Sequence, residues 1–362
     1  MRRRSFLGCV GAGVTGLAGC VGGNGDGEST PSTTPTTTGT ADPATVVVAT
    51  YESWVDGSNP AGPWVKQAFE SRHDDVTVEY EVPSNGLNTY IQRAKQGADI
   101  EADCYVGLNV DELIRLDEQL DDPLFDSLDG DLEGSGRVKE SLRFDPDGRA
   151  IPYDTGYISL VYDEREVEPT SFDDLTAERN RGDLLAQNAQ QSDTGRAFLL
   201  WTIHEFGADG YLDYWQALQD NEVRILGSWS DAYNAYLNED APMVVSYSTD
   251  QVYASQETDD LTRHQVGFLN DQGYANPEGM ARFAGADDPG ATADLMSFML
   301  TDDTQGQIAE RNVQFPAVAD PDLDEEFAQY AHEPPEPVTH SYEELAGNVD
   351  GWVEEWARQV AG

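Results

Sequence analysis

Short apolar runs alternate with amphipathic stretches along the chain from about Thr45 onward, and this alternation limits the possible folds more than any other feature. Three apolar runs predict strands, and the stretch after each run repeats its apolar residues at helical spacing. These predicted strands and helices lie at residues 45–51, 62–73, 76–82, 87–98, 103–109 and 110–120. Strands that alternate with helices in this way predict a parallel α/β sheet.

The alternation resumes after the apolar run YDTGYISLVYD at residues 153–163 and makes a second α/β set. A folded part of roughly 315 residues exceeds one ordinary hydrophobic core, so two lobes are expected. The predicted divisions are residues 45–152 with 256–320 for lobe 1, 153–255 for lobe 2 and 321–362 for a C-terminal helical segment. Because open sheets bind ligands at the loops that follow strand ends, a ligand cleft is predicted between the lobes.

The N-terminus, MRRRSFLGCVGAGVTGLAGC, has the features of an export signal at residues 1–20, and Arg3 and Arg4 resemble the twin-arginine type. Its last four residues, LAGC, resemble a lipobox, which predicts that Cys20 is lipidated and anchors the protein at the extracellular face of the membrane. The alternative is an ordinary cleaved signal in which Cys20 has no such role. Residues 21–44, rich in Gly, Ser, Thr and Pro, predict a disordered tether.

The cysteine and histidine content argues against disulfide and zinc sites. Once Cys9 leaves with the signal and Cys20 is lipidated, only Cys104 remains, so no intramolecular disulfide is expected. The five histidines are scattered without the spacing of zinc ligands. Neither a metal nor a cofactor is therefore predicted.

The chain is strongly acidic, with 21 basic and 68 acidic residues and a formal net charge of −47. Such a surface is typical of an extreme halophile, and it excludes nucleic-acid binding because no basic patch is available for phosphates. At about 1 M salt the Debye length is only ~3 Å, so the net charge does not steer a ligand over distance. Any preference for a cation must then come from contacts inside a pocket.

Two loops that follow predicted strands carry candidate site residues. Tyr51 and Glu52 lie just past the first strand. Ser192, Thr194 and Gly195 lie at a helix start, where free backbone N–H groups can hold an anion or a polar atom. The alternative for this second loop is simple capping of the helix by Ser192 or its neighbour Asp193.

The segment GSWSDAYNAYLNEDAPMVVSYSTDQVYAS (227–255) is unusually rich in aromatic residues. Tyr233 and Tyr236 recur at helical spacing and are expected in the core. Trp229 lies in the first turn of that helix, Tyr247 lies at a strand end and Tyr253 lies one turn into the next helix, so all three are expected to face the cleft. An aromatic wall suits a flat cationic ring, since each desolvated cation–π contact stabilises by about 0.5–2 kcal/mol.

From about Val46 to Val360 the chain resembles the thiamine-binding extracellular solute-binding proteins of ABC importers. The resemblance is carried by an ordered series of segments, with W-S-x-A-Y and S-Y-[ST]-T-x-x-x-Y as the most specific pair. The segments are TYESW, ADCYVGL, PYDTGYISLVYD, LLWTIHEFG, GSWSDAYNAYL, VVSYSTDQVYA, NVQFPAVAD and WVEEWARQV.

This resemblance implies a periplasmic-binding-protein-like type II fold, in which a hinge joins two α/β lobes around the ligand cleft. It implies a monomer that captures thiamine, or its phosphates, and delivers it to a membrane permease. Ring contacts then fall on Trp229, Tyr247 and Tyr253. Ser192 falls on the family's helix-start serine.

Weaker assignments from the resemblance are Tyr51, Glu52 and Asp154. The carboxylates of Glu52 and Asp154 can accept from the exocyclic amine or balance the thiazolium charge. Asp154 has an alternative role at the hinge, where the chain first crosses between lobes. Two tryptophans of the family are missing, with Ser58–Asn59 and Val313 in their places. Asp193 adds a negative charge beside Ser192, which predicts a preference for thiamine over its phosphates.

Three alternatives remain at this point. Capture of ferric iron is disfavoured because the chain has no neighbouring tyrosine pair, and polyamines and other small cations stay open. A secreted enzyme is disfavoured because no Gly-x-Ser-x-Gly segment appears and no histidine is placed as a base. In a purely structural surface protein, the aromatic residues of 227–255 would be ordinary core.

Overall fold

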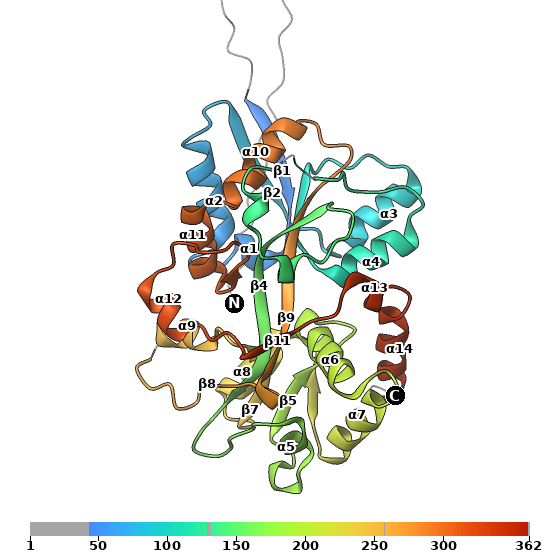
Figure 1. The fold of residues 1–362 in the computed structure, drawn as a ribbon, viewed down its shortest axis with the longest axis vertical. Helices are drawn as coiled ribbons and strands as arrows, with labels where there is room; N and C mark the ends of the chain where they lie inside the picture. The colour runs from blue at the N-terminus through green and yellow to red at the C-terminus, as the bar shows by residue number, and fades with distance from the viewer. Residues whose placement is uncertain (1–42, 129, 131, 257, 361–362) are drawn as a thin grey trace, which may run out of the picture. The chain divides into compact units, whose positions relative to one another are not determined.

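Two long antiparallel strands, β4 (Ala150–Tyr162) and β9 (Gln272–Arg282), run side by side through the centre of the molecule (Figure 1). The computed structural model describes residues 43–128, 130, 132–256 and 258–360. The predicted signal with Cys20, and the predicted tether as far as residue 42, lie outside the described residues.

A single sheet contains these strands in the order β2-β1-β3-β9-β4-β7-β5-β6. The other strands on this path are β1 (Ala44–Ala49), β2 (Val76–Glu81), β3 (Cys104–Leu108), β5 (Leu184–Gln187), β6 (Arg224–Leu226) and β7 (Met243–Tyr247). Three short strands lie off this path and pair with the two central strands. β8 (Gln265–Gly267) and β10 (Phe315–Pro316) pair with β4, and β11 (Glu336–Val338) pairs with β9.

The sheet is mixed, although the sequence pattern predicts a parallel one. β1, β2 and β3 are mutually parallel, as are β5, β6 and β7, but β4 and β9 pair antiparallel with each other, and β9 with β3 and β4 with β7 are also antiparallel. Before β4, the described residues of 120–149 form the short 3-10 turns Ser135–Arg137 and Glu140–Leu142 and no crossover helix. From these registers, the carboxyl ends of both parallel sets point at the middle of the sheet, where loops can meet around a ligand.

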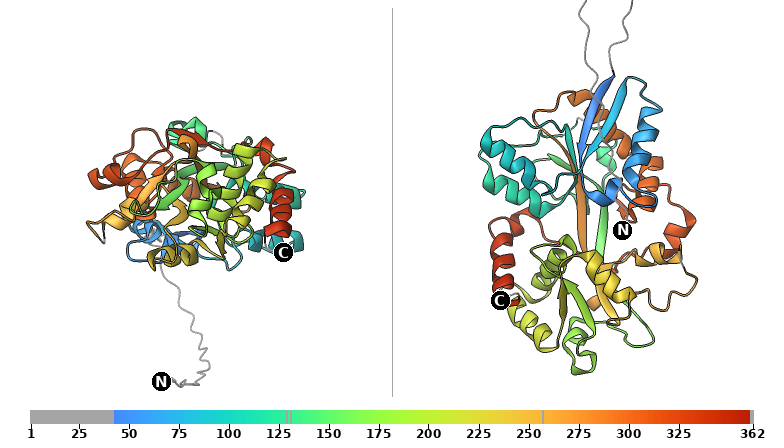
Figure 2. Two further views of the ribbon diagram at one scale, coloured as in Figure 1. Left: turned by 90° about the horizontal axis from the view of Figure 1, so that it is seen from below. Right: turned by 180° about the vertical axis from the view of Figure 1, so that it is seen from behind.

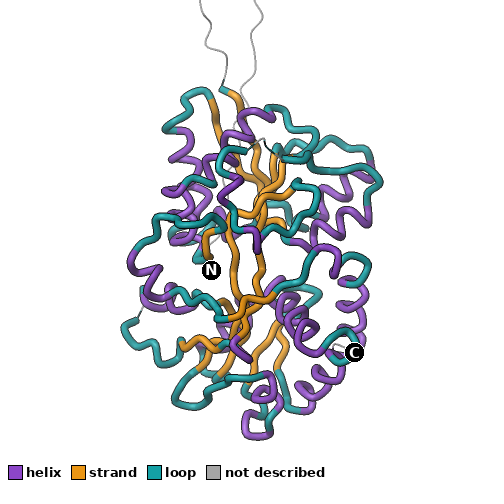
Figure 3. The backbone as a smooth tube through the Cα atoms, in the orientation of Figure 1, coloured by secondary structure: helices purple, strands orange, loops and turns teal. Residues whose placement is uncertain are grey.

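Helices flank the column of strands on both sides, in an upper and a lower group (Figure 3). We call the part around β1–β3 lobe 1; its helices are α1 (Glu52–Val55), α2 (Ala61–Glu70), α3 (Asn88–Gln96), α4 (Val110–Gln119), α10 (Pro289–Met299) and α11 (Asp302–Asn312). We call the part around β5–β7 lobe 2; its helices are α5 (Phe172–Thr176), α6 (Asp193–Phe206), α7 (Tyr211–Asp220), α8 (Trp229–Leu237) and α9 (Asp250–Ser255). β4 and β9 extend into both lobes, so these strands give no single residue at which one lobe ends and the other begins. The lobe boundaries expected from the sequence therefore stay a prediction.

The C-terminal part contains α12 (Glu325–Tyr330), α13 (Tyr342–Leu345) and α14 (Val349–Val360) as well as β11. The Tyr342 hydroxyl in α13 donates to Asp117 Oδ2 of α4 at 2.7 Å. In α14, the Trp356 ring packs edge-on against Trp215 of α7 at 5.3 Å between centroids. The red helix α14 lies beside lobe 2 in both views of Figure 2. This segment therefore contacts both lobes.

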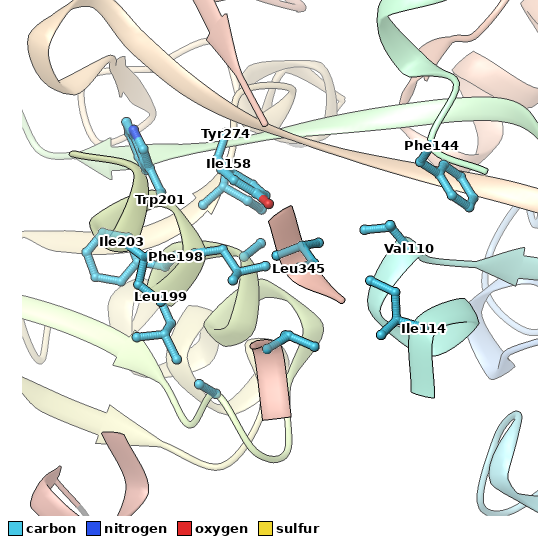
Figure 4. Close-up of a cluster of buried hydrophobic side chains, with 14 of the residues drawn as sticks. Val110, Ile114, Phe144, Ile158, Phe198, Leu199, Trp201, Ile203, Tyr274 and Leu345 are labelled. Atoms are coloured by element: carbon cyan, nitrogen blue, oxygen red, sulfur yellow. The ribbon is translucent and has the colours of Figure 1, made fainter. Parts of the chain in front are cut away.

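The largest apolar cluster draws on both lobes and on the C-terminal segment. Figure 4 shows its members around α6, which supplies Phe198 and Trp201, and β4, which supplies Ile158. Ile114 of α4 and Leu345 of α13 belong to the same cluster. Among the described residues, no helix is long and apolar enough to cross a membrane.

Candidate ligand-binding cleft

A cavity of about 480 Å³ lies between the lobes, where the carboxyl ends of the two parallel sets meet. Its lining is rich in aromatic rings and carboxylates. The rings belong to Tyr51, Tyr105, Trp229, Tyr233, Tyr247 and Tyr253. The carboxylates belong to Glu112, Asp193, Asp250 and Glu278.

Lobe 2 supplies one aromatic wall of the cavity. The Ser228 side chain accepts from the backbone of Asp231 and starts α8, which places Trp229 in its first turn. The Trp229 indole stacks on Tyr233 with centroids 4.9 Å apart and rings 15° from parallel. Its Nε1 donates to Ser246 Oγ at 3.0 Å, so a polar contact also fixes the ring. Tyr253 is 47% exposed and meets Tyr233 edge-on.

The buried carboxylate of Asp250 fixes the position of Tyr233 in this aromatic wall. Asp250 accepts from the Tyr233 hydroxyl at 2.5 Å and lies 2.8 Å from His264 Nδ1. Its side chain is almost completely buried, so these partners replace the water that a free carboxylate would need. The tyrosine that backs Trp229 therefore has a fixed orientation before any ligand enters.

Two further cavity tyrosines lie flat against strands, and each depends on a glycine. Tyr247 ends β7, and a Cβ at Gly156 of β4 would lie 2.6 Å from its ring carbons. Tyr51 follows β1, and a Cβ at Gly107 would lie 2.5 Å from its ring carbons. Gly107 also has φ of +101°, which disfavours other residues. The Tyr247 hydroxyl lies 3.3 Å from Thr194 Oγ1, which links it to the start of α6.

The floor of the cavity carries two neighbouring carboxyl groups. Asp154 of β4 and Glu278 of β9 are cross-strand partners in the antiparallel register. The Tyr153 hydroxyl donates to Glu278 Oε2 at 2.6 Å, and Asn312 Nδ2 donates to Asp154 Oδ2 at 2.7 Å. Burial, and then the charge of Glu278, raise the pKa of Asp154 well above its ordinary value. Burial likewise raises the pKa of Glu278, against the hydrogen bonds that it accepts.

The rim of the cavity carries acidic residues at two helix starts, Glu112 in α4 and Asp193 in α6. Burial, followed by the charges of Asp193 and Asp111, raises the pKa of Glu112 to about 8. Arg196 of α6 forms an ion pair with Asp111 of α4, and both side chains are mostly buried. This ion pair joins the two lobes beside the cavity.

The end of α11 brings a cation and an unusual backbone to the cavity. The Arg311 guanidinium lies over the Trp64 ring, 5.5 Å from its centroid, and donates to the side chains of Asn59 and Gln307. Its charge is thus engaged by lobe 1 itself.

Val313 also lines the cavity and adopts the left-handed conformation with φ of 53°. A β-branched residue in this conformation is strained, as is common at binding sites.

Five of the nine residues proposed from the sequence line the cavity: Tyr51, Thr194, Trp229, Tyr247 and Tyr253. The other four lie outside its lining. Ser192 caps α6 by accepting from the backbone of Gly195, and Gly195 packs closely against the backbone of Gln187. Glu52 is exposed at the start of α1, and Asp154 lies fully buried beside Glu278. The Ser192 position thus has the geometry of the capping alternative.

Several residues that line the cavity are not among those predicted from the sequence, and Glu112 and Glu278 are two of them. The signal for Glu112 was present, since it lies in the first helical turn after the third strand. Glu278 lies in the middle of β9, where no strand end marks a ligand position. Tyr233, expected in the core, is 4% exposed and also lines the cavity.

In the part of the chain that the structure describes, no group of three or more His, Cys, Asp or Glu side chains is arranged to hold a metal ion. Cys104 is a free, buried thiol whose pKa is raised by burial.

The sequence and the fold of this chain are similar to those of known proteins. A family model described as bacterial extracellular solute-binding protein matches residues 64–335. The thiamine-binding periplasmic protein of Salmonella typhimurium is 26% identical over 324 residues, which cover 87% of this chain and 93% of that protein.

Two solved structures share the fold. A periplasmic thiamin binding protein superposes with a TM-score of 0.74 at 24% identity, covering 88% of this chain and 96% of that one. A ferric binding protein from Campylobacter jejuni superposes with a TM-score of 0.71 at 15% identity, covering 87% and 99%. The fold is therefore the two-lobed α/β fold of periplasmic binding proteins. Since the family match runs from α2 through both lobes to the region before β11, this chain belongs to the bacterial extracellular solute-binding proteins.

Proposed function

We propose that this chain captures thiamine in the cleft between its lobes and delivers it to the membrane permease of an ABC importer. The observation that carries the proposal is a cavity lined by aromatic rings and by carboxylates, in which the lining arginine is already engaged. Thiamine offers a flat aminopyrimidine and a permanently charged thiazolium ring, which match those two kinds of wall. The names of the relatives point to the same ligand.

The expected affinity is sufficient for a transport receptor. Each desolvated cation–π contact contributes about 0.5–2 kcal/mol. Three or four such contacts with the rings of Tyr51, Trp229, Tyr247 and Tyr253, together with hydrogen bonds, reach roughly −8 kcal/mol, which is micromolar binding. We assign these residues, with Thr194, to ligand contact. Capture and release require no chemical step on the ligand.

The finer parts of the proposal concern the cell. We propose that a twin-arginine-type signal exports the chain, that lipid on Cys20 anchors it at the extracellular face of the membrane, and that it works there as a monomer at high salt. The segments MRRRSFL and LAGC and the net charge of −47 support these assignments. Mass spectrometry of the protein from its native membrane tests the lipid directly, because a mature chain beginning at an acylated Cys20 is expected.

A ligand panel at high salt tests the function. Thermal melting and titration calorimetry should show a rise in melting temperature and micromolar binding with thiamine, and neither effect with common sugars or spermidine. Iron(III) should give no tyrosinate colour band. Failure of thiamine to bind, with any other ligand raising the melting temperature, would overturn the assignment.

A matched pair of exposed side chains separates ligand contact from stability. Tyr253 is 47% exposed inside the cleft, and Leu237 is 46% exposed at the end of α8, outside the cavity lining. Tyr253→Ser should weaken thiamine binding roughly tenfold, the equivalent of one lost ring contact. Leu237→Ser should leave the affinity unchanged.

A further inference from the structure

The two carboxyl groups on the cavity floor are placed where like charges repel. Asp154 and Glu278 are register partners on the antiparallel strands β4 and β9, next to a register shift between Pro152 and Asp154. Cross-strand partners of this kind have Cβ atoms about 4.5–5.5 Å apart. Two carboxylates at this separation in a buried site do not both ionise readily, because each disfavours the charged form of the other.

A chain of neutral hydrogen-bonding groups connects the two carboxyls. Tyr153 donates to Glu278, and its hydroxyl oxygen lies 3.3 Å from that of Tyr51. The Tyr51 hydroxyl donates to Asn312 Oδ1 at 3.1 Å, and the Asn312 amide donates to Asp154. These groups hold the carboxyls in place without bringing a positive charge to them.

One oxygen of this arrangement is unsatisfied. Asp154 Oδ1 is fully buried and has no hydrogen-bond partner among the described residues. A buried carboxylate oxygen without a partner is costly, and this cost falls when the carboxyl group is protonated and neutral. Burial and the neighbouring acid therefore favour a state in which the two carboxyls together hold one proton and one negative charge.

The groups that face the pair from the surrounding elements are polar or acidic. They are Tyr51 after β1, Tyr153 on β4, Asn312 on α11, Tyr247 on β7, Tyr105 on β3 and Asp193 on α6. Arg311 lines the same cavity, but its guanidinium lies over Trp64. The missing positive charge is therefore left for a ligand to supply.

We propose that Asp154 and Glu278 share one proton while the cleft is empty and release it to solvent when a cationic ligand binds, so that the pair selects the ligand by its charge. This inference rests on the proposed function only for the identity of the cation. The exchange is balanced, because one positive charge enters the site as one proton leaves it. Glu278, which lines the cavity, faces the ligand, and Asp154 acts through it as a positioning residue. Burial raises the pKa of both groups, that of Asp154 well above its ordinary value, and this direction favours retention of a proton on the pair.

Calorimetry in buffers of different ionisation enthalpy counts the protons released. Binding of thiamine near pH 7 should release about one proton, a consequence of the linkage between ligand and proton binding. The neutral thiamine analogue in which carbon replaces the thiazolium nitrogen should release none and bind roughly tenfold or more weakly. Thiamine affinity should also rise with pH until the pair has lost its proton.

Substitutions distinguish proton release by this carboxyl pair from proton release by Glu112 on the cavity rim. Glu278→Gln should abolish proton release and weaken thiamine roughly tenfold or more, while sparing the neutral analogue. In Glu112→Gln, the proton released from the floor should persist. Asp154→Asn provides a second route to the same loss of release, should Glu278→Gln fold poorly. Release that survives in both floor variants, or disappears in Glu112→Gln alone, overturns the inference.

Infrared difference spectroscopy tests the shared proton without relying on thiamine. The empty Glu112→Gln protein, in which the rim acid contributes no such band, should show a buried protonated carboxyl band near neutral pH that is missing when Glu278→Gln or Asp154→Asn is added. Absence of this band overturns the inference even if thiamine binds. Thiamine that fails to bind while the band is present removes the proposed ligand and leaves the carboxyl pair intact.

Discussion

At the residue scale, each of the two helix starts that face the cleft carries an acidic side chain, and Asp193 is the one that we expect to repel an anion. Glu112 and Asp193 lie in the first turns of α4 and α6 and both line the cavity. Free N–H groups at a helix start attract anions, but a carboxylate at the same place repels a second anion. The rim therefore opposes the phosphate group of a phosphorylated ligand.

We accordingly expect thiamine to bind more tightly than thiamine monophosphate. Asp193→Asn removes one repelling charge and should improve the affinity for the monophosphate by roughly tenfold, with little effect on thiamine. Asp213→Asn is the control, because Asp213 also lies in the first turn of a lobe 2 helix, α7, but away from the cavity lining. Titration calorimetry measures both ligands, and a wild-type protein that prefers the monophosphate would refute the expectation.

The raised pKa of Glu112 has a consequence for stability. Its ordinary value is 4.5 and its folded value is about 8, so between these limits the folded protein holds a proton that the unfolded chain has lost. The stabilisation from this proton is complete below about 4.5 and is lost as the pH rises through about 8. Glu112→Gln should therefore gain melting temperature relative to wild type as the pH rises across this window.

Melting of the ligand-free protein at several pH values checks this difference. Glu325→Gln serves as the control, since Glu325 is an exposed acid in the first turn of α12. Its melting temperature should follow that of the wild type at every pH. A constant difference between Glu112→Gln and wild type would contradict the burial of a protonated Glu112.

Residues at the ends of elements were the ones that the sequence could place. The sequence predicts that Trp229 and Tyr247 face the cleft because they lie at a helix start and a strand end, and both line the cavity. Glu52 follows the first strand equally well but lies exposed, since α1 begins there and turns its side chain away. Glu278 gave no signal, because its position follows from the pairing of β9 with β4 and not from local pattern.

At the element scale, two strands make room for the rings of the cleft. β4 carries Gly156 against Tyr247, and β3 carries Gly107 against Tyr51. Gly156→Ala would place a methyl carbon 2.6 Å from both the Tyr247 ring and Gln314 Oε1. Contacts this short force the ring to move, so thiamine affinity should fall at least about tenfold.

The control for this change is Gly285→Ala, an exposed position where an added Cβ meets no atom within 4 Å. It should leave affinity and melting temperature unchanged. Calorimetry and thermal melting of the two variants distinguish loss of the ring position from loss of the fold. Wild-type affinity in Gly156→Ala would mean that Tyr247 does not need its present position to contact the ligand.

Strand positions could be predicted from the sequence, but the directions of the central strands could not. Apolar runs bounded by polar residues mark β1, β2 and β3, and the intervening helices fix their parallel pairing. β4 and β9 pair with each other through residues more than a hundred positions apart, such as Asp154 with Glu278. Local periodicity carries no information about such partners.

At the scale of the whole molecule, a bridging segment and a bridging ion pair tie the lobes together. α13 packs on α4 of lobe 1, and α14 packs on α7 of lobe 2. The Arg196–Asp111 pair adds a mostly buried link beside the cavity. The two-lobed plan was predictable from chain length and repeated α/β pattern, whereas this bridging depends on which surfaces the last helices cover.

The net charge of −47 should affect the stability of the folded protein more than it affects ligand binding in the cleft. Self-repulsion of the acidic surface destabilises the compact state, and salt screens it, since the Debye length falls from about 10 Å at 0.1 M to about 3 Å at 1 M. The melting temperature should therefore rise steeply with sodium or potassium chloride. Sucrose at equal osmolality is the control, because it favours burial without screening charge.

Binding should not follow the same curve. In the cleft, a ligand cation would lie in direct contact with Glu278 and the aromatic rings, at separations shorter than or close to the Debye length at about 1 M salt. Thiamine affinity should thus change less than about tenfold between roughly 1 M and 3 M salt, while stability continues to depend on salt. Affinity that falls in step with added salt would mean that the ligand is held by the long-range field of the acidic surface. It would then have to bind outside the buried contacts of the cleft.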